Sequence, residues 1–294
     1  MKYVDKDLVL KRMGARLHTN RITKNIFLLA TLLGLVVLVT LFYRVLSDGL
    51  GWINIGFLTN KLSTVPERAG IMGAILGTVW LMIVVVPVTM ILGIGTAIYL
   101  EEYATKGRLQ SFIQTNISNL AGVPSIVFGI LGMTVFVRTM GLGNIVLAGG
   151  LTMSLLVLPI VVVASQEALR SVPQFLREAS YGMGATKWQT IKKVVLPAAI
   201  PGILTGVILA LSRAVGETAP LVVVGIPALL IPFPNSIFDK FTVLPIQIYY
   251  WTLDSALVAE YANLAAATII ILLLILLIMN SIAVIIRNKF QKRY

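Results

Sequence analysis

The chain contains no cysteine and a single histidine among its 294 residues. The lack of cysteine excludes disulfide bonds, thiolate metal sites and cysteine nucleophiles. The one histidine, His18, lies in a basic segment with no second candidate ligand nearby, and the acidic residues of the loops are scattered without metal-ligand spacing. We therefore expect no metal site and no catalytic residue on this chain.

Charge is scarce as well. Only 12% of the residues are charged, whereas 57% are hydrophobic and the mean hydropathy is +0.92. A soluble domain could not bury that much apolar surface, so the composition indicates an all-α polytopic membrane protein surrounded by lipid. The net charge of +12 would suggest a nucleic-acid partner in a soluble protein. In a membrane protein the placement of the charges matters more than their sum, and we expect no nucleic-acid partner.

Six apolar runs are long enough to cross a membrane as helices, which need about 20 residues each. They lie at about 26–46, 70–100, 117–137, 145–164, 201–225 and 263–286. This division leaves an N-terminal tail (1–25), a six-helix transmembrane domain (26–286) and a C-terminal tail (287–294). The loop at 226–262 is rich in proline and aromatic residues, which suits an interfacial segment better than a flexible linker.

The basic residues predict which side of the membrane each loop occupies. The two tails, the turn at 101–111 and the loop at 165–200 together hold 18 Lys and Arg, and the three opposite loops hold 4. Cytoplasmic segments carry an excess of these residues. We therefore expect both termini and the 165–200 loop in the cytoplasm.

The most informative stretch of that loop runs from Glu178 to Pro197, with sequence EASYGMGATKWQTIKKVVLP. A short helix at about 173–181 is expected to end at Gly182 and Gly184, because glycine accepts the left-handed conformation of a helix C-cap. Thr186 followed by Gln189 fits a capping box and predicts a second short helix. Pro197 and Pro201 then bracket the start of the fifth apolar run.

This stretch resembles the signature loop of the permease subunits of bacterial ATP-binding-cassette (ABC) importers. The residues that match its pattern in register are Glu178, Ala179, Gly184, Leu196 and Pro197, whereas Ser180 and Val194 replace its second Ala and its Ile. The resemblance implies a type I importer permease whose coupling loop (165–200) is gripped by a dimer of ABC ATPase subunits. Glu178 would be the polar anchor, and Gly184 would allow the sharp turn. The alternative is an ordinary helical loop.

A nucleotide site on this chain itself is not expected. The run from Gly182 to Lys187 superficially looks like a phosphate-cradling loop, but it lacks the four residues between glycines and the Gly-Lys-Ser/Thr of a P-loop. We expect no cofactor on this chain, with ATP and magnesium bound by the partner ATPase.

The fifth run carries an ionic pair in an otherwise apolar segment. Arg213 lies about 18 Å past Pro201 along a continuous helix, near the middle of a core about 30 Å thick. A lone charge there costs at least ~2.5 kcal/mol, so we expect it to face a partner or a wet pathway. Glu217, four residues on, is the obvious partner. Either the two form only a buried clamp, or Arg213 presents its guanidinium fork to a tetrahedral oxyanion while Glu217 holds or gates it.

The sequence around this pair is similar to the PstA-type permeases of phosphate importers. The matching segments are 167–173, 176–179, 211–221, 244–249 and 280–287. The resemblance implies phosphate as substrate, with a second permease subunit of the PstC type, an ATPase pair and an external phosphate-binding protein as partners. It also implies that Arg213 and Glu217 line the path, with Arg170 as a further candidate. Taken alone, an arginine such as Arg170 is more often one that snorkels toward the interface or faces lipid.

Three other functions remain compatible with the residues. A permease of the same architecture could carry sulfate, molybdate or another oxyanion. A secondary transporter could use Arg213 and Glu217 as a proton-coupled pair, although the chain shows no repeated broken helices. A scaffold or sensor subunit would not transport at all.

Overall fold

The computed structural model describes residues 6–105, 107–227 and 233–290, and within them the chain is helical. The helices, in chain order, are α1 (Lys6–Gly49), α2 (Ile55–Thr59), α3 (Met72–Ile98), α4 (Arg108–Leu120), α5 (Ser125–Gly132), α6 (Val146–Arg170), α7 (Gln174–Gly182), α8 (Lys187–Thr190), α9 (Leu196–Gly216), α10 (Ala219–Val224), α11 (Leu244–Asp254) and α12 (Glu260–Phe290). Short 3₁₀ turns lie at Leu50–Trp52 and Pro66–Arg68, and π-helical turns lie at Tyr99–Tyr103, Met133–Thr139 and Ile191–Val195.

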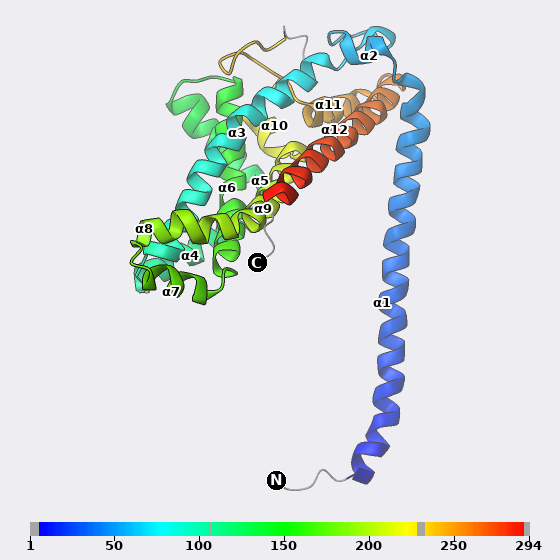
Figure 1. Cartoon of the computed structure of the whole chain (residues 1–294). Coiled ribbons are helices and arrows are strands. Elements are labelled where there is room, and N and C mark those ends of the chain that lie inside the picture. The colour runs from blue at the N-terminus through cyan, green and yellow to red at the C-terminus, as the bar shows by residue number, and fades with distance from the viewer. Residues whose placement is uncertain (1–5, 106, 228–232, 291–294) are drawn as a thin grey trace.

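Five of these helical segments are long and apolar enough to cross a membrane, and a bent pair, α4 with α5, brings the number to six. The predicted spans at 70–100, 145–164 and 263–286 correspond to α3, α6 and α12. Helix α1 extends from the predicted first span back into the predicted tail. Its C-terminal end contacts α12, whereas the rest of the helix stands apart from the bundle (Figure 1). The part of each predicted tail at 1–5 and at 291–294 lies outside the described residues.

The predicted third span at 117–137 is wrong at its start. Helix α4 ends at Leu120, and α5 begins at Ser125 at an angle of 103° to it. Pro124 occupies the position just before α5 and has no N–H to continue the preceding helix, and a residue that precedes proline avoids the helical conformation. The helix therefore breaks before Pro124. The apolar segment after the break runs from Ser125 to Thr139.

The predicted boundaries of the fifth span are also wrong. A single helical segment runs from Lys187 through Pro197 and Pro201 to Gly216, so the second short helix of the coupling loop is the first part of that span. Pro197 is accommodated because Leu196 bonds back to the carbonyl of Ile191, in a π-helical turn just before the proline. At the other end the helix stops at Gly216, and Glu217 has an extended backbone before α10.

Helices α3, α6 and α9 form the centre of the bundle, and small residues let them approach closely. Gly93 of α3 lies against Val161 of α6, and Gly150 of α6 lies against Val84 of α3. On α9, Gly202 and Gly206 lie against Ala168 and Ala164 of α6. Both glycines of α9 therefore pack on this chain's own α6.

The loop expected at 226–262 folds back onto the bundle in its described parts. Helix α11 packs along α12, and the ring of Trp251 lies 6.3 Å from Phe57 and 6.5 Å from Tyr261. Asp239, expected to be a solvated loop residue, accepts hydrogen bonds from the backbone amides of Asn235 and Ser236. The bond from Asn235 is the main cause that lowers the pKa of Asp239 below its ordinary value.

We expect Gly206→Ala to destabilise the bundle by about 1–3 kcal/mol, because the added methyl group would overlap the side chain of Ala164 and force α6 and α9 apart. The matched control is Gly95→Ala on α3, where an added methyl group meets nothing within 4 Å. That change should stabilise the protein by about 0.5–1 kcal/mol, because alanine loses less entropy than glycine in a helix. Thermal unfolding of both variants in detergent measures the difference, and equal Tm values would contradict this packing.

Candidate functional site

The coupling loop forms two helical arms around a glycine turn. The backbone N–H of Gly184 bonds to the carbonyl of Tyr181, and that of Ala185 bonds to the carbonyl of Ser180, which is the pattern of a Schellman C-cap. Gly184 has φ of +80° there. Thr186 and Gln189 form the reciprocal bonds of a capping box at the start of α8. The glycine cap and the capping box predicted from the sequence are both present.

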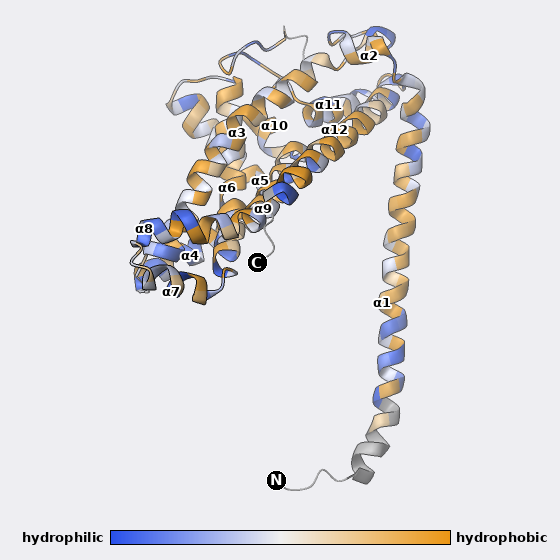
Figure 2. Ribbon diagram, viewed as in Figure 1, coloured by the Kyte–Doolittle hydropathy of each residue, from blue (hydrophilic) through white to orange (hydrophobic). Residues whose placement is uncertain are grey.

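The outer surface of these arms is exposed and partly apolar. The side chains of Phe175, Tyr181, Met183 and Trp188 are exposed, as are Glu178 and Ala179. On the opposite side of α7, Leu176 packs against the core. A hydrogen bond of 2.9 Å between the hydroxyls of Ser180 and Thr190 joins α7 to α8. Helices α4, α7 and α8 lie together at one end of the bundle, toward which the N-terminal end of α1 also points (Figures 1 and 2). Leu196 and Pro197 lie beyond this surface, within the long helix.

Sequence reasoning missed the four exposed apolar side chains. The signal for two of them was the amphipathic pattern of residues 174–182, in which Leu176 and Ser180 face inward while Phe175 and Tyr181 face outward.

Arg213 and Glu217 lie where α9 breaks rather than in the middle of a continuous helix. Arg213 is in the last turn of α9, where helix-end carbonyls favour a positive charge. Its Nε donates to Oε1 of Glu217 at 3.1 Å. The side chain of Arg213 is 50% exposed and that of Glu217 is 18% exposed. Among the described residues, neither terminal guanidinium nitrogen has an acceptor, so both Nη groups remain unpaired there.

A second polar contact lies beside this pair. The hydroxyl oxygen of Ser212 lies 2.5 Å from Oδ1 of Asn280 on α12 and 2.8 Å from the carbonyl oxygen of Ile208, so its one proton serves one of these two acceptors at a time. The contact ties the end of α9 to α12. Sequence reasoning did not single out Asn280, although a lone amide in an apolar helix is a signal for such an interhelical bond.

Arg170 is the last residue of α6 and lies within the coupling loop. It forms two bonds with Glu101, from Nη2 to Oε1 at 2.6 Å and from Nε to Oε2 at 2.9 Å, and a third with Glu167 at 3.1 Å. The guanidinium therefore binds carboxylates of its own chain, and the snorkelling interpretation stays a prediction. A role for Arg170 in the substrate path stays a prediction, and the structure does not bring it together with Arg213.

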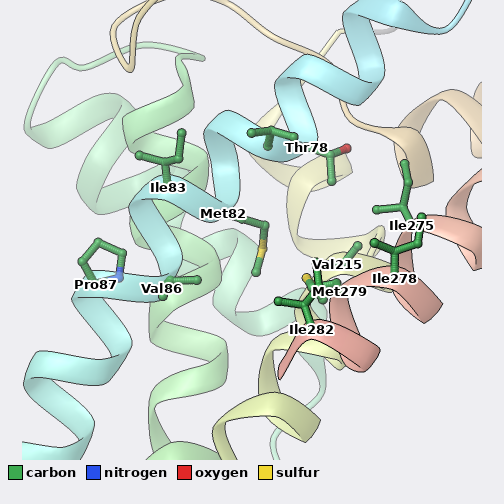
Figure 3. Close-up of a pocket in the computed structure, with 11 residues that line it drawn as sticks. Thr78, Met82, Ile83, Val86, Pro87, Val215, Ile275, Ile278, Met279 and Ile282 are labelled. Carbon is green, nitrogen blue, oxygen red and sulfur yellow. The ribbon is translucent and has the colours of Figure 1, made fainter. Parts of the chain in front are cut away.

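An apolar cavity of ≈ 620 Å³ separates α3 from α9 and α12. Figure 3 shows Met82, Val215 and Met279 directed into it from the three helices. Its lining holds one hydroxyl, that of Thr78, which already bonds within the protein. An anion would lose its hydration there without compensation, so this cavity does not suit an ionic substrate.

Within the residues that the structure describes, no group of three or more His, Asp and Glu could hold a metal ion. The exposed loop from Gly182 to Lys187 is a helix cap followed by a capping box and is not preceded by a strand. It therefore lacks the arrangement of a nucleotide-binding loop.

Residues 89–292 match the family described as "Binding-protein-dependent transport system inner membrane component". The chain is 39% identical over 210 residues to "Phosphate transport system permease protein PstA 1" of Mycobacterium tuberculosis, which covers 69% of this chain and 68% of that protein. It is 36% identical over 256 residues to "Phosphate transport system permease protein PstA" of Mycobacterium leprae, covering 83% and 81%. A solved bacterial ABC transporter involved in alginate import has a similar chain, with a TM-score of 0.66, 17% identity and coverage of 96% and 100%. At that identity the likeness concerns the fold.

Proposed function

Because this chain belongs to the family of binding-protein-dependent transport system inner membrane components, we propose that its substrate is inorganic phosphate. It is a multi-pass inner-membrane protein and a permease subunit of an ABC importer, with the predicted type I fold. Phosphate is supported by the relatives that are named as phosphate permeases, which match this chain over 69% and 83% of its length.

The observation that carries the proposal is the half-exposed guanidinium of Arg213. It holds one bond to Glu217 and keeps two donor nitrogens without a partner among the described residues. Such a fork matches the oxygens of a tetrahedral oxyanion. Glu217 competes for the same guanidinium and repels an anion, so occupancy would be brief, which suits a path better than a storage site.

The coupling loop is the proposed contact with the ATPase subunits. Its exposed apolar side chains (Phe175, Tyr181, Met183 and Trp188) would fill the cleft of the ATPase, with Glu178 as the polar anchor. Exposed apolar residues rimmed by polar ones are typical of a protein–protein contact. ATP and magnesium would be bound by those subunits. By the excess of basic residues, this end of the bundle and both termini face the cytoplasm.

The remaining partners would be a second permease subunit and an external phosphate-binding protein. In the complete complex, closure of the ATPase dimer would move the loop and switch the bundle between inward- and outward-facing states, because the loop is where the two states differ in contact.

We expect uptake of radiolabelled phosphate by proteoliposomes that contain this chain with its ATPase, second permease and binding protein. Uptake should stop when ATP is removed, and excess sulfate or molybdate should not compete. Competition by either anion would assign the chain to another oxyanion. Uptake that survives ATP depletion but collapses with the proton gradient would indicate secondary transport. A scaffold role predicts that Arg213→Ala leaves uptake unchanged.

A further inference from the structure

Three elements meet at the coupling-loop end of the bundle, and one of them is far from the other two in the sequence. They are the π-helical turn at Tyr99–Tyr103 that ends α3, the C-terminal end of α6 and helix α7. Helix α6 leads directly into the coupling loop, and α9 leaves it. Helix α3 has no such covalent link, although it packs along α6 over much of its length. Any movement of α7 can therefore reach the end of α3 only through side-chain contacts.

A buried ion pair provides that contact. Nη2 of Arg177 on α7 lies 3.0 Å from Oε1 of Glu102, and the two side chains are only 13% and 8% exposed. The same guanidinium donates to the carbonyls of Val172 at 2.7 Å and Leu169 at 3.0 Å. Arg177 thus holds the end of α6 and the end of α3 at the same time. Removal of one partner from such a pair leaves an uncompensated buried charge.

A second pair lies beside the first and extends the contact to α4. Glu101 binds Arg170 of α6 through two bonds and also accepts from Nε2 of Gln166 at 3.0 Å. Gln166 exchanges two amide hydrogen bonds with Gln114 of α4, at 2.7 and 3.0 Å. Glu101 and Glu102 are adjacent in one turn and bind two different arginines. Arg170 ends α6 and Arg177 lies on α7, so both arginines are within the coupling loop.

We infer that these two ion pairs form a joint, made of Glu101, Glu102, Arg170 and Arg177, at the end of α3. The Glu102–Arg177 pair fastens α7 to α3, and the Glu101–Arg170 pair fastens α6 to α3. Movement of α7 is delivered through Arg177 and Glu102 to α3, while α9 receives it through the continuous helix. Arg177 and Glu102 are positioning residues, because they act on the bundle and not on the substrate. This inference rests on the proposed contact between the coupling loop and the ATPase.

The test uses the complete reconstituted complex and measures phosphate uptake and ATP hydrolysis together. Replacement of both partners (Glu102→Leu with Arg177→Met) removes the joint without leaving a lone buried charge. We expect this double variant to assemble and hydrolyse ATP, while phosphate taken up per ATP hydrolysed falls about 5-fold or more, the usual scale of coupling between sites. A purely structural role would lower both activities together.

Because this chain contains no cysteine, a second experiment can use introduced cysteine pairs. Glu102→Cys with Arg177→Cys can be bridged by a short bifunctional methanethiosulfonate and released by reductant. Uptake per ATP should be low when the variant is reduced and recover when it is bridged. The wild-type complex treated with the same reagent controls for thiols on partner subunits. Glu167→Gln is the matched charge control, since Glu167 is 65% exposed and contacts Arg170 without reaching α3.

Each outcome decides one of the two proposals. Normal uptake per ATP in the double variant, or no recovery on bridging, overturns the joint while leaving the importer function intact. A wild-type complex that does not assemble with the ATPase, or that takes up phosphate without ATP, overturns the proposed function instead.

Discussion

Gly184→Val is expected to reduce phosphate uptake at least about tenfold in the assembled transporter. Gly184 has φ of +80°, and an added side chain would meet nothing within 4 Å, so the effect arises from the backbone and not from a clash. A β-branched residue in that conformation costs about 1–3 kcal/mol. The chain would escape the strain by leaving the left-handed region, which breaks the two bonds of the Schellman cap and changes the angle between α7 and α8. Uptake and ATP hydrolysis measured on the same proteoliposomes report the loss.

Two neighbouring substitutions serve as controls. Gly182→Ala lies two residues away, with negative φ and no atom within 4 Å of the added methyl group, so it should behave like the wild type. Gly184→Asn should be intermediate, because asparagine tolerates the left-handed conformation better than other residues. Equal losses for Gly182→Ala and Gly184→Val would show that this turn is sensitive to any side chain and that the cap geometry is not the cause.

Arg213→Gln is expected to lower phosphate uptake about 10- to 100-fold at unchanged assembly. Loss of one hydrogen bond to a charged group costs about 1.5–3 kcal/mol, which is close to this range, and the amide N–H groups of glutamine can keep one of the two contacts that the free guanidinium nitrogens would make. Ser212→Ala is the matched control one residue away, since it removes the bond to Asn280 without changing the charge. Ser212→Ala should lower the thermal stability and leave phosphate uptake unchanged.

The double variant Arg213→Gln with Glu217→Gln separates the two interpretations of the pair. If the pair were only a clamp, removal of both charges would restore the uptake that Arg213→Gln loses, because no lone carboxylate remains. If Arg213 binds the anion, uptake stays low in the double variant. Glu217→Gln alone should then tighten phosphate binding while slowing turnover, because the competitor for the guanidinium is gone.

The sequence predicted most of the spans because long apolar runs depend on the bilayer and not on tertiary contacts. It predicted the turn at Gly184 and the capping box at Thr186 because both are local rules that involve residues within a few positions of each other. Prolines were harder to interpret. Pro124 separates two helices at 103°, whereas Pro197 lies inside a continuous one. In the continuous helix, a π-helical turn closed by the bond from Leu196 to the carbonyl of Ile191 precedes Pro197.

The joint around Glu102 and Arg177 could not be predicted from the sequence by such rules. Its two ion pairs connect residues 69 and 75 positions apart. Glu101 and Glu102 looked like part of a polar turn, and nothing in their spacing indicated arginine partners. The break at Glu217 was also missed, because Arg213 and Glu217 were expected on one continuous helix. Pro220, near the start of α10, was the local signal for that break.

The unbroken helix from Lys187 to Gly216 works as a lever. At 1.5 Å per residue it places the guanidinium of Arg213 about 40 Å from the capping box at the opposite end. A rigid rod of that length would turn a tilt of roughly 5° at its base into a sweep of about 3.5 Å at its tip. In the proposed mechanism, a rocking motion too small to reorder the core would then be enough for Arg213 to engage or release an anion.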